Sequence, residues 1–148
     1  MIYYVMDPGT GEFKPVPDTL KKGITVTSAA EVMPAIGKKI IGKVEQFFCL
    51  YLDNANRIIK ASILSRGTDD QTAVYPREVA REMLRVHATG LIVAHNHPSG
   101  SNKPSPADIE ITRKLKQCLD VFEFRFLDHV IISGPTTYFS FRENGLIP

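Results

Sequence analysis

Residues 90–108 read GLIVAHNHPSGSNKPSPAD, and this stretch decides the fold class. Its first part, Leu91–Ala94, is a short apolar run between a glycine and a polar loop, which is typical of a buried strand. Its last part predicts a helix from Pro106 to about Leu119, because Ser105 suits the N-cap and Pro106 the first helical position. A buried strand that leads through a loop into a helix indicates an α/β protein.

The segments on either side continue this alternation of strands and helices. Apolar runs bounded by turn residues predict strands, and a capping box or an N-terminal proline predicts a helix. The expected strands are Val44–Leu52, Arg57–Leu64, residues 122–132 and residues 138–141, and the other expected helices are Ser28–Ile41 and Pro76–Ala88. This alternation around one sheet predicts a three-layer α/β arrangement. Residues 1–23 are rich in Pro and Gly and are expected to form an N-terminal arm, with a short strand at Ile2–Val5.

Length and composition are those of one compact domain. The chain has 148 residues, of which 43% are hydrophobic and 23% charged, which excludes a disordered chain and a coiled-coil rod. The net charge of +2 gives no global sign of nucleic-acid binding. Cys49 and Cys118 are far apart, so neither a disulfide scaffold nor a Cys-rich zinc site is expected. No stretch has the composition of a signal peptide or a membrane helix, so we expect a cytoplasmic protein without membrane contact.

Three side chains of residues 90–108 have the chemistry of a metal site. His95 and His97 alternate at the end of an extended segment, so both imidazoles project to one side. Asp108 lies one turn into the following helix, from where its carboxylate can reach back toward the strand end. Two imidazoles and a carboxylate suit zinc, and an open fourth position would make the site catalytic. Each part also has a structural interpretation, because histidines occur in polar loops and Ser105–Asp108 is a good helix start.

The combined pattern H-x-H-P-x(6)-S-x-x-D resembles the JAMM motif of the JAB/MPN metalloprotease superfamily. The wider sequence resembles the bacterial RadC family from about Ile24 to the C-terminus. The segments that carry this resemblance are Pro76-Arg77-Glu78, AHNHPSG at residues 94–100, Asp128-His129 and SFRENGLI at residues 140–147. It implies a JAB/MPN-like (cytidine deaminase-like) domain over residues 24–148, with helices on both faces of a central mixed sheet.

The resemblance also implies a set of roles. His95, His97 and Asp108 would hold zinc, Glu45 would be the general base, and the Ser105 hydroxyl would stabilise the oxyanion. The reaction implied is hydrolysis of a peptide or isopeptide bond in a protein substrate whose identity stays open. The residue type of Glu45 agrees, because we expect a carboxylate near the start of an apolar strand to have a shifted pKa that suits proton transfer. A surface ion pair with Lys43 is the alternative.

Several alternatives stay open. Asn96 stands where deubiquitinating members have Ser or Thr, which argues against a ubiquitin-like substrate. Residues 1–23 are not expected to hold the DNA-binding helix-hairpin-helix of longer RadC proteins, which weakens the DNA-repair interpretation. The alternatives to a hydrolase are a DNA-repair or other nucleic-acid-linked factor and a non-catalytic interaction module, and a homodimer is a further possibility. Glu78 and Glu82 are weaker catalytic candidates that fit exposed ion pairs on a helix. Asp128 and His129 fit either support for a ligand histidine or a plain polar pair.

Overall fold

The computed structural model describes residues 2–6, 13–17, 25–32, 45–65, 74–97, 99–134 and 137–147. In these ranges the chain forms seven strands and two helices, with a further helical turn at residues 29–32. The strands are β1 (Ile2–Met6), β2 (Phe13–Pro17), β3 (Gln46–Leu52), β4 (Ile58–Ser65), β5 (Gly90–Asn96), β6 (Arg125–Ile132) and β7 (Tyr138–Ser140), and the helices are α2 (Pro76–Arg85) and α3 (Pro106–Val121).

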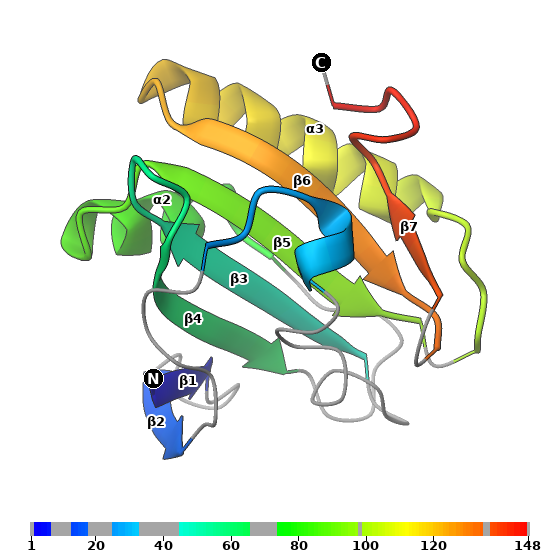
Figure 1. Cartoon of the computed structure of the whole chain (residues 1–148), viewed down its shortest axis with the longest axis horizontal. Helices are drawn as coiled ribbons and strands as arrows, with labels where there is room; N and C mark the ends of the chain where they lie inside the picture. The colour runs from blue at the N-terminus through cyan, green and yellow to red at the C-terminus, as the bar shows by residue number, and fades with distance from the viewer. Residues whose placement is uncertain are drawn as a thin grey trace.

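The described strands form one mixed sheet in the order β2-β1-β4-β3-β5-β6-β7 (Figure 1). The pairs β1/β4 and β5/β6 are parallel, and the other neighbouring pairs are antiparallel. The helical turn at residues 29–32 covers one face of the sheet, whereas α2 and α3 cover the other (Figure 1). The structure therefore confirms the expected three-layer α/β/α fold with a central mixed sheet.

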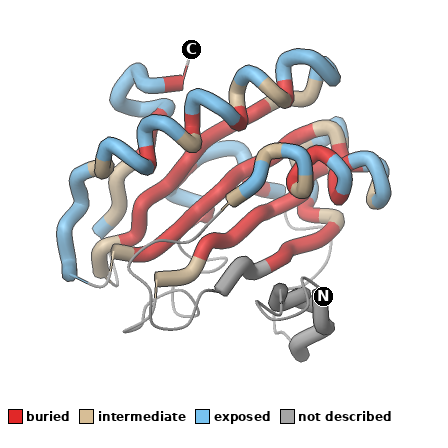
Figure 2. Tube along the Cα trace, turned by 180° about the vertical axis from the view of Figure 1, so that it is seen from behind, coloured by how far each residue is buried: buried red, intermediate tan, exposed pale blue. Residues whose placement is uncertain are grey.

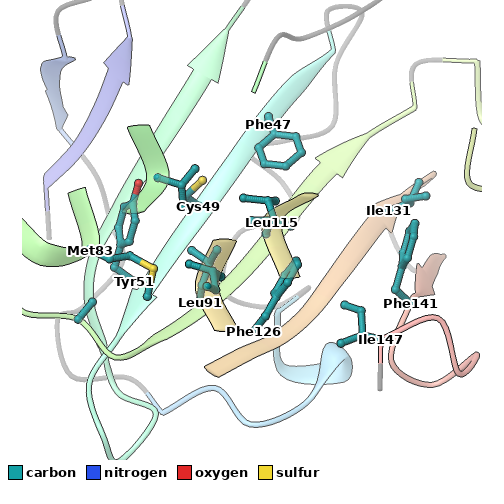
Figure 3. Packing of buried hydrophobic residues seen from close by; sticks show 14 residues of the cluster. Phe47, Cys49, Tyr51, Met83, Leu91, Leu115, Phe126, Ile131, Phe141 and Ile147 are labelled. Atoms are coloured by element: carbon teal, nitrogen blue, oxygen red, sulfur yellow. The ribbon is translucent and has the colours of Figure 1, made fainter. Parts of the chain in front are cut away.

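The two faces of the sheet carry separate hydrophobic cores, because side chains alternate between the faces of a strand. On β3, Phe48, Leu50 and Leu52 pack with residues of the helical turn. The intervening Phe47 and Cys49 pack under α2 and α3 with the other residues labelled in Figure 3. The central strands are buried along most of their length, whereas the helices expose their outer faces (Figure 2). The first residues of β3 and the last residues of β5 are thus held in place by the packed cores on the two faces of the sheet.

The helices begin where the sequence predicts them but end at different residues. Pro76 and Pro106 lie at the first helical positions, as expected. Helix α2 ends at Arg85 rather than near Ala88, because His87 adopts a left-handed conformation with φ of 60°. Helix α3 extends to Val121, two residues beyond the expected end. No helix among the described residues is both long and apolar enough to cross a membrane.

The expected helix Ser28–Ile41 is described only in part. Residues 29–32 are helical, and residues 33–41 lie outside the described residues. The carboxylate of Glu31 accepts hydrogen bonds from the backbone N–H and the hydroxyl of Thr27, both at 3.1 Å. Ser28 and Glu31 have the spacing of a capping box, which predicts Ser28 as the partner of the Glu31 carboxylate. The observed partner is Thr27, one residue earlier, so this part of the prediction was wrong.

The N-terminal residues contribute two strands to the edge of the sheet. β1 matches the expected short strand, whereas β2 was not predicted because Pro15 and Pro17 argue against a strand. The position of β2 at the sheet edge explains this, since an edge strand tolerates residues that lack a backbone N–H. The boundary between an arm at residues 1–23 and a domain at 24–148 stays a prediction.

Glu82 differs from the expected exposed ion pair. It is buried on the inner side of α2, where it forms a salt bridge with the equally buried Lys60 of β4. It also accepts hydrogen bonds from Arg85 at 2.7 and 2.9 Å. Glu78 matches the predicted ion pair more closely, because its partly exposed carboxylate lies 3.4 Å from Arg81. Glu82 is therefore a structural residue that ties α2 to the sheet.

Candidate metal centre

Four of the expected site residues converge at one end of the sheet. Each of Glu45, His95, His97 and Asp108 offers a ligand atom, and these atoms lie within 4.8 Å of one another. They come from the start of β3, the end of β5 and the start of α3, which meet at this end (Figure 1). Residues more than 60 positions apart in the chain are thereby brought within reach of one ion.

Asp108 is the centre of the shortest contacts in this group. Its Oδ1 lies 3.1 Å from Nε2 of His95, and its Oδ2 lies 3.0 Å from Nε2 of His97. The two Nε2 atoms are 3.0 Å apart. His95 is almost fully buried, and Asp108 is also buried. One carboxylate and two imidazoles thus point at a single small volume.

Local structure explains why these three side chains meet. His95 shares its sheet face with Leu91 and Val93, and His97 follows two residues later, directly after the strand end. Asp108 is held by a capping box, in which the Ser105 N–H donates to the Asp108 carboxylate at 2.8 Å and the Asp108 N–H donates to the Ser105 hydroxyl at 3.0 Å. The cap therefore fixes the carboxylate in the pose that faces the histidines.

Glu45 lies at the rim of the group. Its Oε1 is 3.8 Å from Nε2 of His95, farther away than the Asp108 carboxylate. The next residue, Gln46, donates its backbone N–H to Oδ1 of the buried Asn96 at 2.6 Å. This bond ties the start of β3 to the end of β5, so Asn96 holds the backbone that carries Glu45. Lys43, the alternative partner of Glu45, lies outside the described residues.

The charges in this group favour a bound cation. Burial alone would raise the pKa of Asp108, but hydrogen bonds with His95 and His97 outweigh burial and hold that pKa well below its usual range. The hydrogen bond with Asp108 raises the pKa of His97. Two carboxylates so close together need positive charge between them, which protonated imidazoles or a metal ion can supply. The donor set therefore fits a divalent metal ion.

His129 supports the site from behind. Its Nε2 lies 2.8 Å from Nδ1 of His95, on the side of that ring opposite to Asp108. Its Nδ1 lies 2.6 Å from the hydroxyl of Thr112, which donates to the backbone carbonyl of Asp108 at 2.7 Å. Burial lowers the pKa of His129 well below its usual range, so its ring is neutral. Of the two interpretations of His129, support for a ligand histidine agrees with these contacts.

Asp128, unlike its neighbour His129, makes its hydrogen bonds away from the candidate metal centre. Its carboxylate accepts backbone N–H groups of His129 at 2.7 Å and Arg142 at 3.0 Å, together with the Ser140 hydroxyl. These contacts join β6 to β7 and to the turn that follows β7. Asp128 therefore organises the C-terminal segment, whereas its neighbour His129 faces the site.

Two residues that support the site, Thr112 and Asn96, were not identified as such from the sequence. Thr112 lies one turn after Asp108 on α3, and this spacing is the signal that could have found it. Asn96 was noted only for its departure from Ser or Thr, and nothing in the sequence pairs it with Gln46. Ser105 lies where expected, and its observed contacts are those of a helix cap.

Comparisons with known proteins agree with this geometry. The family model described as the RadC-like JAB domain matches residues 26–146. A UPF0758 protein from Cupriavidus pinatubonensis is 52% identical over 101 residues, which cover 68% of this chain and 44% of that protein. UPF0758 proteins from a Janthinobacterium species and from Vibrio vulnificus are 43% and 41% identical, over 86% and 88% of this chain and 57% and 58% of their own lengths.

The chain thus spans about half the length of the curated relatives it matches. The matched region nevertheless contains every residue of the candidate metal centre, from Glu45 to His129. The family match covers most of the chain, and the histidines and the aspartate that suggest it from the sequence come together in space with Glu45. The chain belongs to the RadC-like JAB domain family.

Proposed function

We propose that this domain is a zinc-dependent hydrolase that cleaves a peptide or isopeptide bond. The observation that carries the proposal is the convergence of Glu45, His95, His97 and Asp108 within 4.8 Å at the end of the sheet. Two imidazoles and one carboxylate are the donor set of many catalytic zinc sites. The chemistry supplied by a bound zinc ion is that of a Lewis acid, which lowers the pKa of a water and polarises a carbonyl.

The distances suggest different roles for the two carboxylates. Asp108 contacts both imidazoles at 3.0–3.1 Å and is the third ligand. Glu45 lies farther out, at 3.8 Å from His95, and is the general base. In the reaction, Glu45 takes a proton from the attacking water as the water oxygen bonds to the carbonyl carbon. The carbon–nitrogen bond then breaks, and Glu45 passes the proton to the leaving amine.

Ser105 is the proposed donor to the developing oxyanion. Its hydroxyl oxygen already accepts the Asp108 N–H, which holds the side chain at the edge of the site. The hydroxyl proton is the group that would donate to the substrate oxygen. The substrate class that follows is a protein or peptide chain, because the scissile bond is an amide.

The test combines metal content with cleavage. Purified protein is loaded with zinc, and zinc per chain is measured by elemental analysis alongside cleavage of a proteome-derived peptide library and of lysine-ε-linked peptides by mass spectrometry. About one zinc per chain is expected, with cleavage by the loaded protein and none by the metal-free protein or by His97→Ala. The absence of zinc binding, or zinc binding with no cleavage of either library, would overturn the proposal. A binding assay with double-stranded and single-stranded DNA on the same sample tests the nucleic-acid alternative.

A further inference from the structure

An unbroken chain of buried hydrogen bonds runs from the backbone of α3 to the back of His95. The Asp108 carbonyl, the Thr112 hydroxyl, the His129 ring and the His95 ring follow one another at 2.7, 2.6 and 2.8 Å. Thr112, His129 and His95 are each at most 3% exposed. Because water has almost no access to these side chains, the position of each proton is set by the hydrogen bonds between them.

The direction of this chain follows from its first member. A backbone carbonyl can only accept, so the single proton of the Thr112 hydroxyl points at the Asp108 carbonyl. The Thr112 oxygen must then accept a proton from His129, which places the ring proton of His129 on Nδ1. The remaining nitrogen of His129, Nε2, is left as an acceptor toward Nδ1 of His95.

The surroundings of His129 favour the neutral ring that this direction requires. Its ring stacks on Phe141 at 4.5 Å between centroids, and the edge of Phe47 packs against it at 5.7 Å. The ring is fully buried among these apolar groups, where a charged imidazole is costly. His95 therefore donates its Nδ1 proton to His129 and turns Nε2 toward His97 and Asp108.

We propose that His129, oriented by Thr112, is a positioning residue that fixes the ring orientation and tautomer of His95 for metal binding. The inference rests on the proposed function in one respect, namely that the group at the end of the sheet holds a metal ion. Hydrogen bonds of this kind commonly change metal affinity 10- to 100-fold when they are lost. Asp108 would thus act at the site twice, with its carboxylate in front of His95 and its carbonyl behind it.

The decisive comparison is between Thr112→Val and Thr112→Ser. Valine keeps the branched shape but removes the hydroxyl, whereas serine keeps the hydroxyl and is the matched control. We expect Thr112→Val to bind zinc about 10- to 100-fold more weakly in competition with a chromophoric chelator, and Thr112→Ser to stay within about threefold of wild type. Wild-type affinity in a folded Thr112→Val would overturn the proposal.

A second measurement does not depend on zinc or on the folding of a variant. Nitrogen-15 NMR of the wild-type histidine rings reports which nitrogen of His129 carries the proton. A proton on Nδ1 and a bare Nε2 are expected, and a proton on Nε2 would overturn the proposal. If wild-type protein binds no zinc, the proposed function fails, and the ring measurement still decides the direction of the hydrogen bonds.

Discussion

Asp108 shows how one residue can satisfy both interpretations of its sequence. The segment Ser105–Asp108 is a good helix start and part of a metal-binding pattern, and the structure has both. The carboxylate accepts the Ser105 N–H and still lies 3.0 Å from His97 and 3.1 Å from His95. The negative charge of Asp108 also stabilises the N-terminus of α3, because the helix dipole is positive there. The cap therefore orients the group that we assign as a ligand.

Glu45→Gln tests the division of roles between the carboxylates. Glutamine has the same shape but cannot take a proton, so we expect activity to fall about 100- to 10,000-fold. Zinc content and melting temperature are expected to stay close to wild type, because Glu45 is the most distant of the four groups. Asp108→Asn is the matched comparison, since it changes a carboxylate to an amide in the same way but should weaken zinc binding. Loss of zinc from Glu45→Gln would instead make Glu45 a ligand.

At the scale of elements, α3 depends on its first turn. Ser105→Ala removes the hydroxyl that accepts the Asp108 N–H, which should lower the free energy of unfolding by about 1 kcal/mol. Zinc affinity should fall with it, because the Asp108 carboxylate loses its fixed pose. Ser105→Thr keeps a capping hydroxyl and should retain both properties. Chemical denaturation and zinc competition measure the two effects, and an unchanged zinc affinity in Ser105→Ala would contradict the link.

Helix α2 depends on the buried pair of Lys60 and Glu82. Glu82→Gln leaves a buried ammonium without its carboxylate and should lower the free energy of unfolding by about 3 kcal/mol. The double change Lys60→Met with Glu82→Leu should recover most of this loss, because no unpaired charge stays buried. Glu78→Gln changes a partly exposed carboxylate on the same helix; it is the control and should stay within about 0.5 kcal/mol of wild type. The free energies of unfolding are measured by urea denaturation. Equal decreases in Glu82→Gln and Glu78→Gln would show that the buried pair does not stabilise the protein more than an ion pair at the surface.

The elements themselves could be predicted from the sequence, because they depend on local signals. The apolar pattern of β3 and β5 and the prolines at the starts of α2 and α3 are such signals. The second strand, β2, could not be predicted, since its prolines are acceptable only at the edge of a sheet. The burial of Glu82 also depends on a partner 22 residues earlier in the chain.

The convergence of His95, His97 and Asp108 could be predicted from their spacing, but the contact of His129 with His95 could not. The pairing of β5 with β6 shifts by one residue at Leu127, so that Val93 lies opposite His129. Strict alternation from Phe126 would turn His129 away from α3, and the irregularity turns it toward His95 instead. No local sequence signal marks this shift. The position of His129 is therefore a property of the folded sheet.

At the scale of the whole molecule, the candidate metal centre joins three elements that are distant in sequence. The start of β3, the end of β5 and the start of α3 bring like-charged carboxylates together. The raised pKa of His97 favours a proton on its ring, which offsets part of this charge in the metal-free protein. Zinc competes with this proton, because only a neutral imidazole binds it. The stability of the protein should therefore depend on pH in opposite ways with and without zinc.

The pH dependence of the metal-free protein follows from the shifted pKa values of His97 and Asp108. The pKa of His97 is raised by its hydrogen bond with Asp108, so its contribution is complete below the ordinary value of about 6.5 and is lost as pH rises through the higher folded value. Burial would raise the pKa of Asp108, but His95 and His97 lower it, so its contribution is present above about pH 4 and is lost in stronger acid. The ion pair thus stabilises the metal-free protein most between about pH 4 and 6.5.

The zinc-induced rise in melting temperature should therefore be small at about pH 5 and increase toward about pH 8. A hundredfold excess of zinc over its Kd corresponds to about 2.7 kcal/mol, which is a shift of several degrees. Melting curves with and without zinc across this range measure the effect, and His97→Ala should show no comparable shift at any pH. A zinc-induced shift that is the same at both ends of the range would mean that His97 does not exchange its proton for the metal, and the ligand set would then have to be reassigned.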